Sequence, residues 1–106
     1  MNPVKLLSLA VLGAVAMPAL AAEGSADAAK SKISMCIGCH GIPGYRTTFP
    51  EVYHVPKIGG QHAAYIVAAL KQYKSGERDH PSMRGIAESL SEKDMADLAA
   101  YYAEKM

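Results

Sequence analysis

The sequence has 106 residues, of which 50% are hydrophobic and 20% are charged, and its formal net charge is +1. A chain of this length forms at most one small domain. The near-neutral charge and the lack of a basic run argue against a nucleic-acid-binding protein. With only two cysteines, the chain also lacks the second cysteine pair that a typical tetrahedral zinc site uses.

Residues 1–21 have the pattern of a secretory signal peptide. Lys5 provides a short positive region, residues 6–17 form an apolar segment, and residues 19–21 (Ala-Leu-Ala) form a small-x-small cleavage site. The alternative is an uncleaved membrane anchor, but the apolar stretch is near the short limit of about 17 residues for a spanning helix, and a glycine and a proline interrupt it. We therefore expect a signal peptide at 1–21 and an exported mature domain at 22–106, with no stable membrane insertion after cleavage.

The mature region is expected to begin with a helix. Ser25 can cap its N-terminus, and the helix is expected to run to about Ser34 or Cys36. Ala29 and Ile33 fall near the same face of this helix as Cys36. An apolar stripe therefore leads directly into the next motif.

Residues 36–40 read Cys-Ile-Gly-Cys-His, which is the attachment signature for c-type haem. Each thiol can add to one vinyl group of the porphyrin, and His40 then lies under the iron, where an imidazole nitrogen can ligate it. A thiol–disulfide active site is an alternative, but it normally lies in a βαβ setting, and the sequence has no strand pattern. A structural disulfide between Cys36 and Cys39 is also open to an exported protein.

Residues 41–60 are rich in glycine and proline, which predicts a long ordered loop. A loop of this length in a small domain is usually functional, and here it would wrap around the haem. A second helix is expected over 61–74, because its apolar residues recur at helical spacing and Gly76 suits a left-handed C-cap. A short helix can follow at 84–89.

The last helix has the clearest start signal. Ser91 and Asp94 resemble a capping box with Asp in place of the usual Glu, and Leu90 can pack against Met95. Apolar residues then recur at helical spacing as far as Tyr102. The fold class that we expect is all-α, with three to four helices.

If the histidine of the motif binds one face of an iron, another residue can occupy the opposite face. The candidates are His54, His62, His80, Met35, Met83, Met95 and Met106. Three methionines are disfavoured, because one adjoins the first cysteine, one lies on the stripe of the last helix and one is terminal. Met83 is favoured, because it follows a Pro-Ser pair in an expected non-helical stretch. The chain between His40 and Met83 is long enough to pass around the haem edge and to place Met83 on the opposite side of the iron. His80, in the same stretch, is the main alternative.

Together these features resemble the class I c-type cytochromes, specifically their small bacterial periplasmic members. The resemblance covers essentially the whole mature region and is carried by residues 36–41, 56–61, 83 and 100–102. Residues 56–65 and 73–78 are similar to single lobes of the dihaem members. Because only one Cys-x-x-Cys-His is present, the chain resembles a one-haem relative.

The resemblance implies a cytochrome c fold, in which the first and last helices cross and one haem c lies in a cleft between helices. It implies thioether bonds at Cys36 and Cys39 and axial ligands His40 and Met83. It also implies that the backbone carbonyl of Pro56 accepts the Nδ1 proton of the ligating histidine. Such a bond would fix the tautomer and the ring orientation.

The expected function is that of a periplasmic one-electron carrier that is not an enzyme. Two axial ligands leave the iron no vacancy for a substrate, and the soft thioether raises the reduction potential. The expected partners are redox proteins in transient complexes with a monomer, and no nucleic acid is expected. The alternatives are a dedicated cytochrome subunit or partner of a dehydrogenase, or a haem sensor or peroxidase-like protein with an open or labile sixth position.

Overall fold

The computed structural model of the chain describes residues 24–48 and 52–105, together with Gly13. Apart from Gly13, the predicted signal peptide at 1–21 lies outside the described residues, as does the terminal Met106. Within the described ranges, none of the helices is both long and apolar enough to span a membrane.

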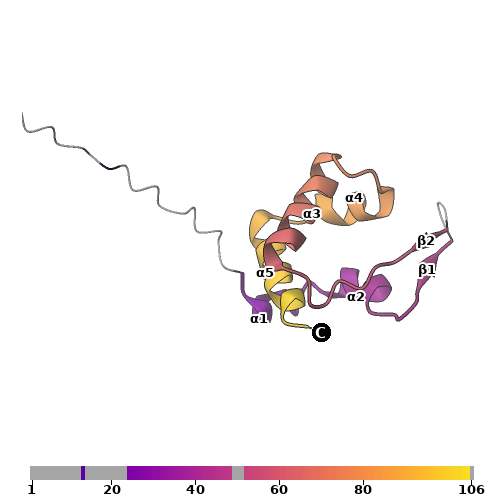
Figure 1. Cartoon of the computed structure of the whole chain (residues 1–106), viewed down its shortest axis with the longest axis horizontal. Helices are drawn as coiled ribbons and strands as arrows, with labels where there is room; N and C mark the ends of the chain where they lie inside the picture. The colour runs from indigo at the N-terminus through magenta and orange to yellow at the C-terminus, as the bar shows by residue number, and fades with distance from the viewer. Residues whose placement is uncertain (1–12, 14–23, 49–51, 106) are drawn as a thin grey trace, which may run out of the picture.

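The described part of the chain is mostly helical, which confirms the expected all-α class (Figure 1). In chain order the elements are α1 (Ala26–Ala29), α2 (Ser34–His40), β1 (Arg46–Thr47), β2 (Tyr53–His54), α3 (Ala63–Ser75), α4 (Pro81–Glu88) and α5 (Glu92–Ala103). The two short strands pair with each other, and the helices form the body of the molecule.

The expected first helix is two helices, which is why the described residues contain five helices and not three to four. Ser25 caps α1 as predicted, because its hydroxyl accepts a hydrogen bond from the Ala28 N–H at 3.2 Å. The amides of Lys30 and Lys32 then bond to carbonyls only three residues back. These bonds tighten the chain into a turn that separates α1 from α2.

The segment that precedes α1 packs closely against α5. A Cβ at Gly24 would overlap the backbone carbonyl of Ala96, so only glycine allows this approach. The buried carboxylate of Asp97, 1% exposed, accepts hydrogen bonds from the Ser25 N–H at 2.8 Å, Lys32 Nζ at 2.8 Å and Lys93 Nζ at 2.9 Å. This network ties the N-terminal segment to the last helix.

Helix α5 supplies most of the hydrophobic core. The capping box at its start is confirmed: the Asp94 N–H donates to the Ser91 hydroxyl at 3.1 Å, and the Ser91 N–H donates to the Asp94 carboxylate at 2.9 Å. The predicted stripe is buried, and it joins residues of α1 and α3. The buried core consists of Ala29, Ile66, Leu90, Met95, Leu98, Ala99 and Tyr102.

Helices α3 and α4 differ in how closely the sequence predicted them. Helix α3 ends at Gly76, which has φ +87° as the C-cap prediction required. Helix α4 begins at Pro81, three residues earlier than expected, because proline suits the first helical position and His80 caps the helix. The expectation that Met83 lies in a non-helical stretch was therefore wrong, since Met83 is in the first turn of α4.

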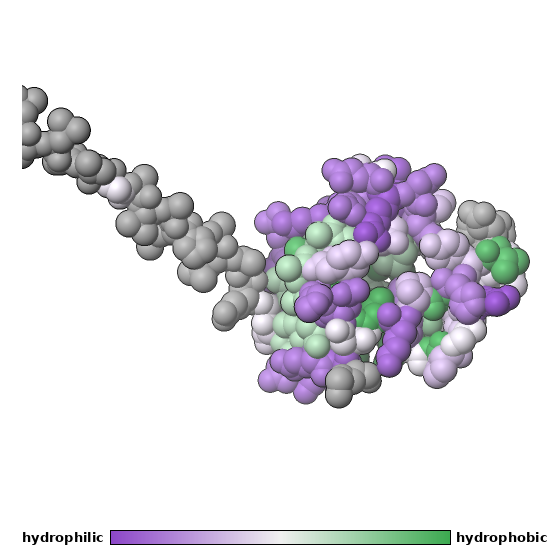
Figure 2. Space-filling view, in the orientation of Figure 1, coloured by the Kyte–Doolittle hydropathy of each residue, from purple (hydrophilic) through white to green (hydrophobic). Residues whose placement is uncertain are grey.

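The segment expected to be a strandless loop contains a β-hairpin, so that expectation was also wrong. Arg46 pairs with His54 and Thr47 with Tyr53 in antiparallel register. The hairpin reaches away from the helical body (Figure 1). Figure 2 shows hydrophobic side chains in the middle of this face, between the hydrophilic groups of the body and the hairpin.

Candidate haem-binding site

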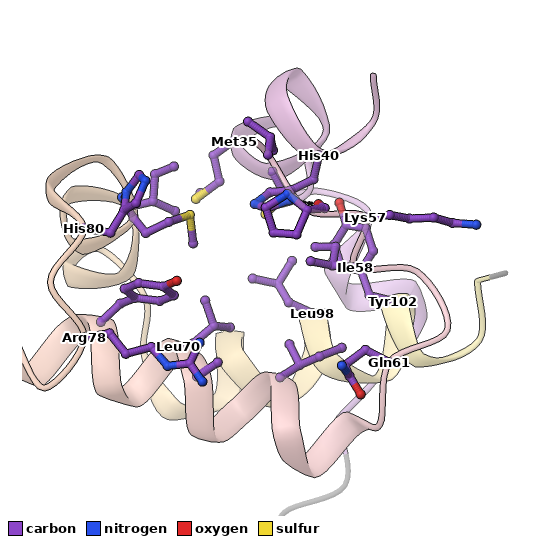
Figure 3. A pocket seen from close by; sticks show the side chains of 18 of the residues that line it. Met35, His40, Lys57, Ile58, Gln61, Leu70, Arg78, His80, Leu98 and Tyr102 are labelled. Atoms are coloured by element: carbon purple, nitrogen blue, oxygen red, sulfur yellow. Dashed lines mark hydrogen bonds between the residues drawn. The ribbon is translucent and has the colours of Figure 1, made fainter. Parts of the chain in front are cut away.

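A cavity of about 270 Å³ lies between the helices and the hairpin. Its wall includes residues from α2, both strands, α3, α4 and α5, as well as the segment between β2 and α3. In Figure 3, His40 of α2 and Leu70 of α3 lie on opposite sides of the cavity, with Leu98 of α5 between them. Segments far apart in the sequence therefore build one apolar recess.

Four of the five residues predicted for the haem site line this cavity. They are Cys36, His40, Pro56 and Met83. Cys39 does not line it, although Cys36 and Cys39 lie on one face of α2 because they are three residues apart. The two thiols are not joined in a disulfide.

The His40 ring is fixed by a single short hydrogen bond. Its Nδ1 lies 2.6 Å from the backbone carbonyl oxygen of Pro56. Because a carbonyl oxygen only accepts hydrogen bonds, Nδ1 must carry the proton, and the neutral ring then keeps a lone pair on Nε2. A carbonyl partner of this kind orients an imidazole for metal binding at its other nitrogen.

The wall of the cavity also contains two methionines and a second histidine. Met83 is partly buried in the first turn of α4, and Met35, on α2, is 38% exposed. Nδ1 of His80 accepts a hydrogen bond from the Met83 backbone N–H at 3.4 Å. A neutral His80 then has its proton on Nε2, so neither ring nitrogen has a lone pair available for a metal.

The other candidate ligands lie away from the cavity. His54 and His62 are exposed, and neither lines the wall. Met95 is 1% exposed and belongs to the core, as its place on the α5 stripe predicted. Among the described candidates for a second ligand, Met83 and Met35 therefore combine a place on the wall with a side chain that does not serve as a helix cap, and Met35 adjoins Cys36 on the helix that carries His40.

Tyr102 is a polar residue of the site that sequence reasoning assigned only to the core. It lines the cavity, and its hydroxyl is buried without a hydrogen-bond partner among the described residues. Burial raises the pKa of Tyr102 to about 12, and the neighbouring Cys36 thiol adds to the effect. Burial likewise raises the pKa of Cys36, which the Tyr102 hydroxyl partly offsets. A buried, unpartnered hydroxyl is typical of a wall that meets a further polar group.

The charges on the cavity wall are all positive. Lys57 and Arg78 line it, and no carboxylate of the described residues does. The Lys57 side chain points away from the cavity in Figure 3. Sequence reasoning did not single out Arg78, although it ends the stretch 73–78 that carried part of the resemblance.

These features fit a haem. The apolar wall suits a flat macrocycle, the Arg78 cation suits its acidic edge, and Nε2 of His40 suits its metal. The Tyr102 hydroxyl has only the Cys36 thiol, a weak hydrogen-bonding group, as a polar neighbour on the wall. Cys36 lies on the wall beside them, where a covalent bond to a cavity-filling group can form.

The chain belongs to the cytochrome c family, because the family model for cytochrome c matches residues 21–103. Within that family it is a small class I c-type cytochrome similar to one lobe of the dihaem cytochromes c4. Membership of this family implies a covalently bound haem c.

The proteins to which the chain is similar include two cytochromes of known sequence and one of known structure. Cytochrome c-554(548) of Halomonas halodenitrificans is 36% identical over 85 residues, covering 77% of this chain and 98% of that protein. Cytochrome c4 of Pseudomonas aeruginosa is 36% identical over 84 residues, covering 79% of this chain and 40% of that protein. The crystal structure of reduced recombinant cytochrome c4 from Pseudomonas stutzeri has a TM-score of 0.54 and 31% identity, covering 79% of this chain and 52% of that chain. The chain thus matches about half the length of the cytochromes c4.

Proposed function

We propose that this protein is a periplasmic one-electron carrier that holds one haem c through Cys36 and Cys39, with His40 and Met83 as axial ligands. The observation that carries the proposal is the 2.6 Å contact between His40 Nδ1 and the Pro56 carbonyl, in a cavity whose wall also contains Met83. Membership of the cytochrome c family supports the same reading.

The bound haem would supply an iron that alternates between the ferrous and ferric states. The residues of the chain would make that exchange fast and exclude other chemistry. His40 is oriented before the electron arrives, because the Pro56 carbonyl fixes its ring. The soft thioether of Met83 would favour ferrous iron and raise the reduction potential. With both axial positions occupied, no substrate could bind the metal, so the protein is proposed not to be an enzyme.

The helical body supports this role because it keeps the ligand-bearing elements in place. Cys36 packs against the core that α5 forms with α1 and α3, and Met83 is held in the first turn of α4. A site that keeps its ligands and geometry needs little rearrangement when its charge changes by one. Rigid placement of His40 and Met83 therefore suits electron transfer better than ligand exchange.

The proposed location is the periplasm, after cleavage of a signal peptide at 1–21. Export suits the proposed cofactor, because bacteria attach c-type haem outside the cytoplasm. The proposed partners are donor and acceptor proteins that meet a monomer transiently. Contacts of this kind are usually small, below about 1,200 Å² in total.

The visible spectrum of the holoprotein tests the axial ligands. The wild type, Met83→Leu and the matched control Met35→Leu would be produced with a c-type maturation system and compared in the oxidised and reduced states. A weak far-red thioether–iron band is expected in the wild type and in Met35→Leu, and its loss is expected in Met83→Leu. If haem is attached but the wild type lacks this band, His80 or an open sixth position replaces Met83. Rapid stoichiometric binding of carbon monoxide to the reduced protein would then indicate a sensor or peroxidase-like function.

A further inference from the structure

The β-hairpin connects two sides of the cavity. Its base belongs to the side that holds His40, because Pro56, whose carbonyl binds the His40 ring, follows β2 after one intervening residue. The cavity wall also includes Thr47 of β1 and Tyr53 of β2. Two paired strands of two residues each are marginally stable on their own. The hairpin therefore needs a contact with the helical body to hold its position.

The hairpin makes that contact through an aromatic cluster, which consists of Tyr53, Tyr73 and His80. Figure 3 shows His80 across the cavity from Lys57 and Ile58, which follow the hairpin in the chain. The Tyr53 ring lies edge-on to the His80 ring, with the centroids 4.9 Å apart and the planes at 74°. The Tyr73 ring of α3 is also edge-on to His80, at 6.4 Å and 80°. These arrangements are favourable for aromatic rings, so the aromatic cluster joins the hairpin to the far side of the cavity.

His80 links the aromatic cluster to Met83. Nδ1 of His80 accepts a hydrogen bond from the Met83 backbone N–H at 3.4 Å and so caps the first turn of α4. A His80 ring that Tyr53 holds in place keeps this acceptor directed at the helix end. Helix ends open more readily than helix centres, and here the end carries the proposed axial ligand. Loss of the Tyr53 ring would therefore favour opening of the turn that holds Met83.

We propose that Tyr53 is a positioning residue, which packs against His80 across the cavity and thereby holds Met83 on the iron. The inference rests on the proposed function, because it takes Met83 as an axial ligand. It also gives a function to the hairpin, which lies within the long segment at 41–60. The Tyr53 side chain is 49% exposed, so its contribution is the ring contact and not the burial of a core residue.

Added imidazole measures how firmly Met83 is held in the ferric holoprotein. Imidazole can bind the iron only in molecules whose Met83 has left, so its apparent affinity is proportional to the fraction of open molecules. An edge-on aromatic contact shifts such an equilibrium by about 2- to 10-fold. Loss of the Tyr53 ring should therefore tighten imidazole binding by that factor. A ring that only obstructed entry would change the association and dissociation rates equally and leave the affinity unchanged.

Two variants of Tyr53 and one control separate the ring contact from other effects. Tyr53→Leu removes the ring, whereas Tyr53→Phe keeps it and removes only the hydroxyl. Val52→Ala is the control, because Val52 adjoins Tyr53, is 69% exposed and does not line the cavity. Imidazole affinities and rates are measured on the ferric holoproteins, and exchange of the Met83 amide proton is followed by NMR on the reduced ones.

Tyr53→Leu should bind imidazole about 2- to 10-fold more tightly than the wild type and should exchange the Met83 amide faster by a similar factor. Tyr53→Phe and Val52→Ala should match the wild type in both measurements. The proposal is overturned if Tyr53→Leu binds imidazole as Val52→Ala does, or if only its rates change and its affinity does not.

A second measurement decides the matter if Tyr53→Leu yields no folded holoprotein. In the reduced wild type, a nuclear Overhauser effect between the Tyr53 and His80 rings supports the proposal, and its absence overturns it. Failure of the proposed function is distinct from both results, because the wild type would then lack the far-red thioether–iron band before any variant is compared.

Discussion

Asp97→Asn tests the contact between the N-terminal segment and the last helix. The wild-type carboxylate is 1% exposed and accepts hydrogen bonds from Ser25, Lys32 and Lys93 at 2.8–2.9 Å. The amide keeps the shape and one acceptor oxygen, but it removes the charge from two charge-assisted bonds. It also turns an NH₂ group toward the lysines.

The loss of stability in Asp97→Asn depends on which interactions Lys32 and Lys93 retain once the charge of the carboxylate is removed. Breaking a fully buried ion pair costs about 3–5 kcal/mol. Lys32, however, retains Asp94 at 2.6 Å, and the Lys93 side chain is 73% exposed and regains water easily. We therefore expect the free energy of unfolding to fall by about 2 kcal/mol, which is one to two charge-assisted hydrogen bonds.

The assay is denaturant unfolding of the holoprotein followed by far-UV circular dichroism, with midpoint and slope both reported. Asp27→Asn is the matched control, because Asp27 pairs with Lys30 at 3.0 Å while its side chain is 91% exposed. The control should change stability by no more than about 0.5 kcal/mol. If Asp97→Asn costs no more than Asp27→Asn, the buried network does not stabilise the fold and the reasoning fails.

Three further predictions concern the same body of the molecule. Hydrogen bonds from Lys32 and Ser91 lower the pKa of Asp94 to about 2, and hydrogen bonds from Lys32, Ser25 and Lys93 lower the pKa of Asp97 still further, against the opposing effect of burial. Stability should therefore be full above about pH 4 and fall as pH drops toward 2, and denaturation midpoints against pH should show a smaller fall in Asp97→Asn. Gly24→Ala should lose about 1–3 kcal/mol in denaturant unfolding, because its Cβ would overlap the Ala96 carbonyl. Tyr102, with its pKa near 12, should give an alkaline phenolate absorbance phase that is absent from Tyr102→Phe.

Each of these has a clear contrary result. An equal acid loss in the wild type and Asp97→Asn would mean that Asp97 titrates alike in the folded and unfolded states. Gly85→Ala is the control for Gly24→Ala, since a Cβ at Gly85 meets nothing within 4 Å. Because Gly85 lies inside α4, where alanine is favoured over glycine, this control should raise the free energy of unfolding by about 0.5–1 kcal/mol. A Gly24→Ala protein as stable as Gly85→Ala would refute the close approach. A Tyr102→Phe titration identical to the wild type would contradict the burial of that hydroxyl.

Features set by a few neighbouring residues could be predicted from the sequence. The capping box of Ser91 and Asp94 and the left-handed C-cap at Gly76 depend on contacts within four residues, so their patterns determine them. The spacing of the haem-attachment motif is likewise local, but the helix that carries it was not predicted, since the expected first helix ended at about Ser34 or Cys36 and α2 runs from Ser34 to His40. These elements already specify an α-helical domain with a haem-attachment motif.

Other features depend on contacts that no local pattern records. The strands of the hairpin are two residues each, too short for an alternating pattern to reveal them. The earlier start of α4 comes from His80 acting as a cap, a role that few histidines have. Arg78 and the unpartnered hydroxyl of Tyr102 join the site only because α3, the segment after it and α5 meet around one cavity.

A redox titration of the mature holoprotein tests the central claim most directly. The reduced visible band is followed against applied potential, and the haem content per chain is measured on the same sample. The account predicts one covalent haem per chain and a single reversible one-electron wave, with the far-red thioether–iron band present throughout the oxidised form. Failure to attach haem, or reduction coupled to loss of an axial ligand, would contradict a rigid His40/Met83 electron carrier.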